Sequence, residues 1–180
     1  MLIKAERSAL LVVHVQARLA PAVHDSARAI ANARVLMTAA RRLGVPVLVP
    51  ELSPGGLGHT VPKIAELAPQ GSIVEEMHFS CVADDAFADR FRELDRGQAV
   101  VAGMEAHVCV LQGAMDLLDK GHEVFVVADA AASRTPENAT AGVERLRAAG
   151  AAIVTTEMVV FEWMERADHP HFRELLALIK

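Results

Sequence analysis

Short apolar runs alternate with longer amphipathic stretches along most of the chain. The runs place hydrophobic side chains at consecutive positions, which is typical of strands buried on both faces of a parallel sheet. We expect the second strand to end at Pro50, because proline cannot donate to a strand ladder. The six predicted strands are residues 9–15, 45–49, 72–76, 98–102, 123–128 and 151–155.

Apolar residues recur at helical spacing between these strands. The clearest case is residues 26–43, where Gly44 follows at the position of a helix C-cap. Asp84 and Thr135 are predicted N-caps, and Pro136 fits the first turn that follows Thr135. The other predicted helices are residues 61–67, 84–94, 106–120, 135–149, 157–165 and 170–179, and residues 52–60 are predicted to form a loop.

Strands that alternate with helices predict an α/β fold with three α-β-α layers. We expect a doubly wound, Rossmann-like parallel sheet of six strands. The 180 residues are 52% hydrophobic and contain no linker, which predicts a single domain over residues 1–180. The Gly-rich segment 55–58 is not a dinucleotide fingerprint, because it does not lie between the first strand and its helix.

Composition narrows the classes of partner. The net charge is −5 and the basic residues are scattered, so no nucleic-acid partner is expected. No apolar run approaches the ~18 residues of a membrane span, and we interpret the apolar N-terminal stretch as a strand and not a signal peptide. Two cysteines provide no disulfide framework, which favours the cytoplasm. No ligand motif predicts a metal or a cofactor.

The carboxyl ends of the strands are where a doubly wound sheet binds ligands, near the reversal of strand order. Polar residues stand at the carboxyl ends of four of the predicted strands. These residues are His14 and Gln16 at the first, Glu51 at the second, Glu75, Glu76 and His78 at the third, and Glu105, His107 and Cys109 after the fourth.

Cys109 lies near the start of a predicted helix, where the helix dipole and free N–H groups lower a thiol pKa. The same N–H groups can stabilise an oxyanion. The alternative is a packed cysteine acting as a small hydrophobe, which is our interpretation of Cys81. His14 is either the base for Cys109 or a core histidine bonded to backbone groups.

The segment 103–112 (GMEAHVCVLQ) resembles the nucleophile segment of isochorismatase-like cysteine hydrolases, in their isochorismatase domain-containing branch. The zinc-binding Asp-x-His pattern of the nicotinamidases is missing after the second strand. The supporting segments are residues 10–16, 51–62 (ELSPGGLGHTVP), 75–80 (EEMHFS), 129–138 (DAAASRTPEN) and 157–163 (EMVVFEW).

The resemblance implies hydrolysis by a Cys nucleophile with an Asp base and a Lys. It also implies a homo-oligomer, a dimer or tetramer, and a cis peptide that here joins Met104 and Glu105. This chain has His14 in place of the Asp and Glu76 in place of the Lys. The signs of the two charges are exchanged, so we hypothesise a Cys109–His14–Glu76 set.

The expected function is hydrolysis of a small amide, ester or enol-ether-like substrate, with an oxyanion held by backbone N–H groups of residues 106–109. The alternative is an inactive family member that binds a small molecule or serves assembly. A redox-sensing thiol resolved by Cys81 ranks last. The residues expected to contact the substrate are Gln16, His78, Met104, Glu105, Ala106 and His107.

Overall fold

The structure is a computed structural model that describes residues 1–180. Its six strands form one parallel sheet in the order β3-β2-β1-β4-β5-β6, which confirms the predicted fold. The order reverses between β1 and β4, so the ligand-binding position of a doubly wound sheet lies there. The strands are β1 (Ser8–Val13), β2 (Val47–Leu52), β3 (Ile73–Glu76), β4 (Gln98–Met104), β5 (Glu123–Ala132) and β6 (Ala152–Val154).

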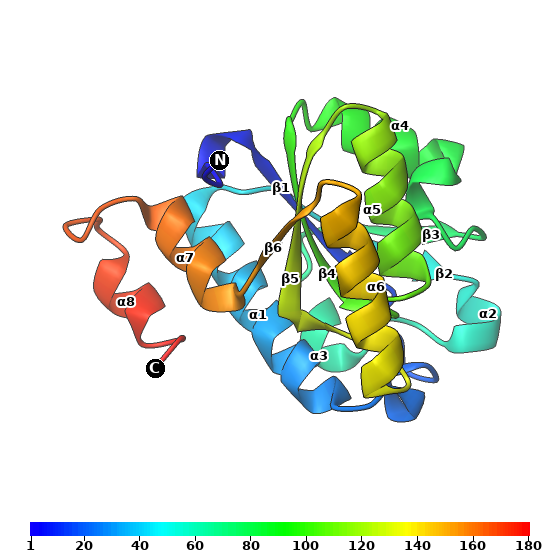
Figure 1. Cartoon of the computed structure of the whole chain (residues 1–180). Coiled ribbons are helices and arrows are strands. Elements are labelled where there is room, and N and C mark those ends of the chain that lie inside the picture. The colour runs from blue at the N-terminus through cyan, green and yellow to red at the C-terminus, as the bar shows by residue number, and fades with distance from the viewer.

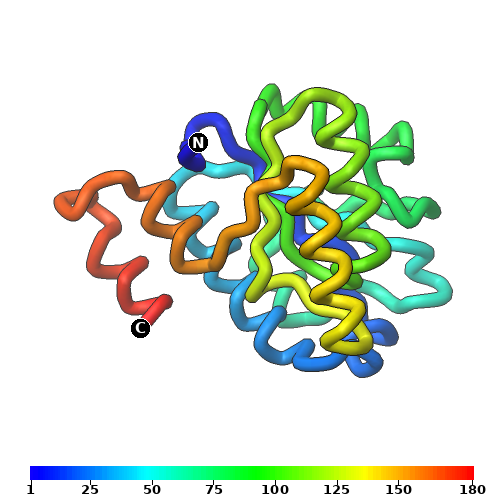
Figure 2. The backbone as a smooth tube through the Cα atoms, in the orientation of Figure 1, coloured from blue at the N-terminus to red at the C-terminus, as the bar shows by residue number.

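Helices cover both faces of the sheet. On one face lie α1 (Ser26–Leu43) and α7 (Thr156–Met164), and on the other lie α4 (Asp85–Glu93), α5 (Cys109–Asp119) and α6 (Pro136–Ala148) (Figure 1). Both chain ends lie on the side of α1 and α7 (Figure 2). The short helices are α2 (Pro54–Leu57), α3 (Pro62–Ala65) and α8 (Phe172–Leu176).

The central strand β1 explains why consecutive apolar residues mark a strand here. All six of its residues are buried. Leu10 and Val12 pack in the core beneath α1, whereas Leu11 and Val13 pack in the core beneath α5. Full burial of one such side chain contributes about 2 kcal/mol, so both cores hold this strand in place.

The predicted helix ends are confirmed at several positions. Helix α1 ends at Gly44, whose φ is 70°. Asp84 caps α4 by accepting hydrogen bonds from the N–H groups of Ala86 and Phe87. Thr135 caps α6 by accepting one from Asn138 N–H.

Several expected boundaries are wrong. Strand β1 ends at Val13 and not at residue 15, and strands β4 and β5 continue beyond their expected ends to Met104 and Ala132. Strand β2 continues through Pro50 to Leu52, because the proline carbonyl still accepts a bond from His14 N–H at 3.2 Å. Helix α5 begins at Cys109 and not at residue 106, because Ala106 N–H donates to Ala132 O at 2.9 Å. The predicted loop at residues 52–60 also contains the short helix α2.

Two glycines allow the backbone before α5 to pack closely. Gly103 has a φ of 124°, and a Cβ there would lie 2.1 Å from Val13 O. A Cβ at Gly142 of α6 would lie 2.8 Å from Ala106 O. Any side chain at either position displaces backbone, so both glycines help to hold the segment before Cys109.

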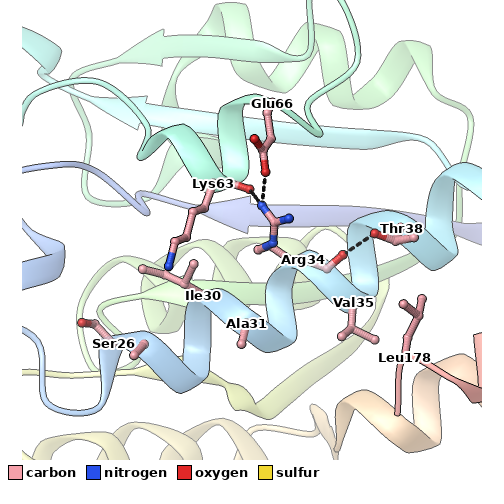
Figure 3. Close-up of a pocket in the computed structure, with 10 residues that line it drawn as sticks. Ser26, Ile30, Ala31, Arg34, Val35, Thr38, Lys63, Glu66 and Leu178 are labelled. Carbon is pink, nitrogen blue, oxygen red and sulfur yellow. Dashed lines mark hydrogen bonds and ion pairs between the residues drawn. The ribbon is translucent and has the colours of Figure 1, made fainter. Parts of the chain in front are cut away.

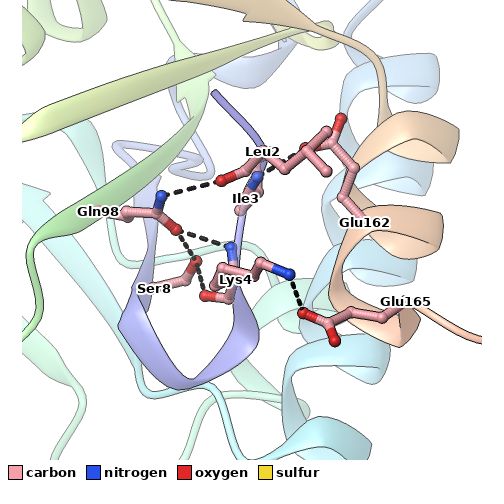
Figure 4. Close-up of polar contacts among 7 residues, drawn as sticks. All are labelled: Leu2, Ile3, Lys4, Ser8, Gln98, Glu162 and Glu165. Atoms are coloured by element: carbon pink, nitrogen blue, oxygen red, sulfur yellow. Dashed lines mark hydrogen bonds and ion pairs between the residues drawn. The ribbon is translucent and has the colours of Figure 1, made fainter.

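Polar contacts fasten the N-terminal segment near the amino ends of strands β1 and β4 (Figure 4). Ile3 N–H donates to Glu162 Oε2 at 2.6 Å, and Lys4 N–H donates to Gln98 Oε1 at 2.7 Å. Lys4 also forms an ion pair with Glu165. These contacts join the segment to α7 and to the start of β4. None of the helices combines the length and hydrophobicity needed to cross a bilayer.

Candidate active site

Three strand ends bring the predicted catalytic residues to one edge of the sheet. His14 follows β1, Glu76 is the last residue of β3, and Cys109 is the first residue of α5 after β4. Because β1 and β4 are neighbours, His14 and Cys109 flank the reversal of strand order. The peptide between Met104 and Glu105 is cis, as the resemblance implied.

His14 and Glu76 form a sealed contact. His14 Nε2 lies 2.6 Å from Glu76 Oε1, and both side chains are 0% exposed. The distance is short but the angle is poor for a hydrogen bond, so both His14 nitrogens and Glu76 Oε1 lack a well-aligned partner. The other carboxylate oxygen, Oε2, accepts the N–H of His78. The two residues that replace the family's Asp and Lys are therefore brought together.

Cys109 is buried, with 5% of its surface exposed. Burial raises the pKa of its thiol to about 11, and the negative charges of Glu76 and Glu105 act in the same direction. A hydrogen bond from the Glu105 backbone opposes them and lowers the pKa. The expected lowering at a helix N-terminus is therefore wrong, because desolvation of the thiolate outweighs it.

Cys81 behaves as the sequence predicted, as a packed thiol. It is 1% exposed, its Sγ packs against Gly113 of α5, and burial raises its pKa far above the usual range.

The N–H groups before α5 are only partly free. Those of Ala106 and Val108 donate to Ala132 O and Glu105 O. Those of His107 and Cys109 have no backbone acceptor. The expected oxyanion site at residues 106–109 is therefore narrowed to the His107 and Cys109 N–H groups.

Glu105 is held by Arg134, a residue that the sequence analysis did not assign. Glu105 Oε1 accepts from Arg134 Nε at 2.9 Å, and Oε2 accepts from Nη2 at 2.7 Å. Arg134 N–H adds a third bond, and the guanidinium lowers the pKa of Glu105. The only sequence signal for Arg134 was its place in the segment 129–138. The Glu105 carboxylate thus braces the segment before Cys109.

The other expected substrate contacts separate into buried and open positions. The Gln16 amide is fully buried and bonds to backbone groups of Leu52 and Gly58. Met104 and Ala106 are also buried, whereas His107 is partly exposed and lies 3.0 Å from Ser133 Oγ through Nδ1. His78 is exposed. Of this set, His107 is the partly exposed residue that lies nearest to Cys109 in the sequence.

The tertiary structure brings together two groups of potential metal ligands that no sequence motif predicted. They are Glu51, His59 and Glu75, and Glu76, His78 and Asp84. The ligand atoms of each group lie within 4.8 Å of one another. Carboxylates in both groups already bind the protein: Glu51 accepts from Thr60 N–H, Glu76 accepts from His78 N–H, and Asp84 caps α4.

Comparison with known proteins gives concordant results. A family model described as "Isochorismatase domain" matches residues 8–158. Isochorismatase domain-containing protein 2 of Danio rerio is 34% identical over 173 residues, 96% of this chain and 86% of that protein. The secreted isochorismatase effector Isc1 of Phytophthora sojae is 37% identical over 149 residues, 81% and 71% of the two chains.

Solved structures agree over nearly the whole chain. MAR1 ribonuclease of Caenorhabditis elegans has a TM-score of 0.93 and 34% identity, covering 99% of this chain and 92% of that one. YcaC of Pseudomonas aeruginosa, solved with hexane-2,5-diol and covalent acrylamide, has a TM-score of 0.92 and 26% identity, covering 98% and 91%. This chain belongs to the isochorismatase family.

Proposed function

We propose that the protein is a hydrolase that uses Cys109 as its nucleophile on a small amide, ester or enol-ether-like substrate. His14 acts as the general base and Glu76 orients it. The observation that carries this proposal is the sealed contact between His14 and Glu76 at the edge of the sheet where Cys109 begins α5.

The cost of this contact supports a chemical role. A buried ionisable pair is seldom more stable than apolar side chains of similar volume, because desolvation offsets the attraction. His14 also has a φ of 49°, a left-handed conformation that costs about 1 kcal/mol in a non-glycine residue. Buried charge and backbone strain together favour a functional position over a passive core histidine.

We assign different roles to the two nitrogens of His14. Nε2 lies against the Glu76 carboxylate, so we assign Nδ1, which has no hydrogen-bond partner, as the acceptor of the thiol proton. No hydrogen bond joins His14 to Cys109 in this structure, so the transfer requires the two side chains to approach when substrate binds. Because the thiol pKa is about 11, Cys109 is protonated at neutral pH and loses its proton as sulfur attacks the substrate. Glu76 then stabilises the imidazolium, as the acid does in other triads.

Hydrolysis of an amide or ester begins when the Cys109 sulfur attacks the carbonyl carbon. The S–C bond forms, the carbonyl π electrons move to oxygen, and the His107 and Cys109 N–H groups receive the oxyanion. Collapse of the intermediate expels the amine or alcohol, which takes the proton from His14. Water then hydrolyses the thioester and regenerates Cys109.

A binding or assembly protein without catalysis is the second candidate. The burial of Cys109 and its raised pKa favour it. The covalent acrylamide on Pseudomonas aeruginosa YcaC favours catalysis, since it shows that a relative reacts with an electrophile.

The first prediction separates these candidates by a screen for hydrolysis of amides, esters and, given the name of the Caenorhabditis elegans relative, RNA. We expect turnover of a small amide or ester to fall by about 10³-fold or more in Cys109→Ala, as for loss of a nucleophile. Cys81→Ala is the matched control, a second buried thiol whose removal should leave turnover within about twofold. Turnover that survives Cys109→Ala rejects the nucleophile.

Two further expectations remain predictions. Assembly as a dimer or tetramer is tested by the mass of the protein in light scattering. The cytoplasmic location is tested by fractionation, and the name of the Phytophthora sojae relative makes secretion the competing outcome.

A further inference from the structure

A groove of about 650 Å³ lies between α1 and α3, beside the C-terminal segment (Figure 3). Its volume is within the range of small-molecule sites. Helix α1 covers one face of the sheet and α5, which carries Cys109, covers the other. The groove is therefore separate from the candidate active site and is independent of the proposed function.

The groove has an apolar side formed mainly by one stripe of α1. Ile30 and Val35 are half-buried there, and the small residues Ala27 and Ala31 are exposed. Leu178 lines it from the C-terminal segment with 37% of its surface exposed. An apolar body of a ligand would remove these side chains from water.

The polar side carries one unpaired positive charge. Arg34 forms an ion pair with Glu66 and also bonds to Lys63 O, so these two charges cancel. The Lys63 amine is in no ion pair and extends from α3 toward Ile30 (Figure 3). A cation beside an apolar surface is complementary to a molecule with one anionic group and a hydrocarbon body.

We propose that this groove binds a small amphipathic carboxylate, with its hydrocarbon part along Ile30, Val35 and Leu178 and its carboxylate at the Lys63 amine. Because the side chain of Ala31 is only a methyl group, it leaves space in the groove for the hydrocarbon.

The probes are decanoate and decan-1-ol, each used below the concentration at which it aggregates. Their binding is measured by calorimetry and by the methyl NMR shifts of Ile30 and Val35. We expect saturable binding of decanoate at one site per chain. Lys63→Gln should weaken decanoate about threefold, the effect of one exposed ion pair, and leave decanol unchanged. Ala31→Trp should abolish binding of both, whereas Lys120→Gln, at the end of α5, should change neither.

Several outcomes overturn the proposal. One is the absence of saturable binding by the wild-type chain. Another is decanoate binding that survives Ala31→Trp in a variant with wild-type circular dichroism. If Lys63→Gln weakens the binding of decanoate and decanol equally, the Lys63 amine does not bind the carboxylate. A lower mass of Ala31→Trp in light scattering assigns the groove to contacts between copies of the chain.

Discussion

Two acid–base contacts flank the segment that leads to Cys109, and they differ in their exposure to water. His14 and Glu76 are both 0% exposed, whereas Arg134 opposite Glu105 is 60% exposed. Water screens the Arg134–Glu105 ion pair, and the exposed Arg134 side chain remains hydrated, so the pair holds the segment before Cys109 with a small desolvation penalty. The first pair is desolvated, and each partner depends on the other. The difference teaches that the sealed contact requires a functional explanation and the open one does not.

The largest effect should follow removal of one sealed partner. Glu76→Gln removes the carboxylate that lies against His14 and disrupts a fully buried polar contact, and we expect a loss of about 3 kcal/mol in urea unfolding. Glu75→Gln is the matched control, because Glu75 is the neighbouring residue of β3 and is exposed. Its change should stay within about 0.5 kcal/mol. Equal effects of the two variants would mean that the sealed contact does not contribute.

The exchange of charge signs can be tested by reversing it. His14→Asp combined with Glu76→Lys restores the residues that the family resemblance implies at these positions. We expect the double variant to be about 2 kcal/mol more stable than the sum of the two single changes, because the charges again pair. If the double variant loses as much unfolding free energy as the two single variants added together, the exchange of charge signs between His14 and Glu76 is rejected.

The burial of Cys109 should appear at alkaline pH. Its pKa is raised from 9.0 to about 11, so the folded state favours the neutral thiol. The stabilisation is complete below pH 9 and is lost as the pH rises to about 11, a change of about 2 kcal/mol. Cys109→Ser does not titrate there, so its unfolding free energy should fall less between pH 8 and 11. Parallel curves for both proteins would contradict the burial argument.

The open contact should give the smallest effect, on the acid side. Arg134 lowers the pKa of Glu105, so the pair stabilises the fold above the usual pKa of a carboxyl group and loses this contribution as the pH falls. Arg134→Gln should lower the Tm by no more than about 2 °C at pH 7, and the difference should shrink toward pH 3. Arg166→Gln, which breaks the exposed pair with Asp168, is the control. A loss as large as that of Glu76→Gln would remove the distinction between the two contacts.

Local signals in the sequence identified the strands and most helix ends. Apolar runs marked β1 and β4, and Gly44, Asp84 and Thr135 marked helix boundaries through their own backbone and side-chain chemistry. The alternation of elements then allowed only a few topologies, since a parallel sheet needs a helix for each return. His14, Glu76 and Cys109 could be nominated because parallel strands end at a common edge.

Other features depended on groups far apart in the chain. The hydrogen bond from Ala106 N–H to Ala132 O delays the start of α5 until Cys109. The Arg134 guanidinium lowers the pKa of Glu105, and burial raises the pKa of the Cys109 thiol. The sequence by itself determined the order of elements and the candidate residues, because these follow from local periodicity and caps. Only the tertiary structure decided which N–H groups stay free and how deeply the site is buried, because hydrogen bonding and desolvation depend on neighbours brought together by folding.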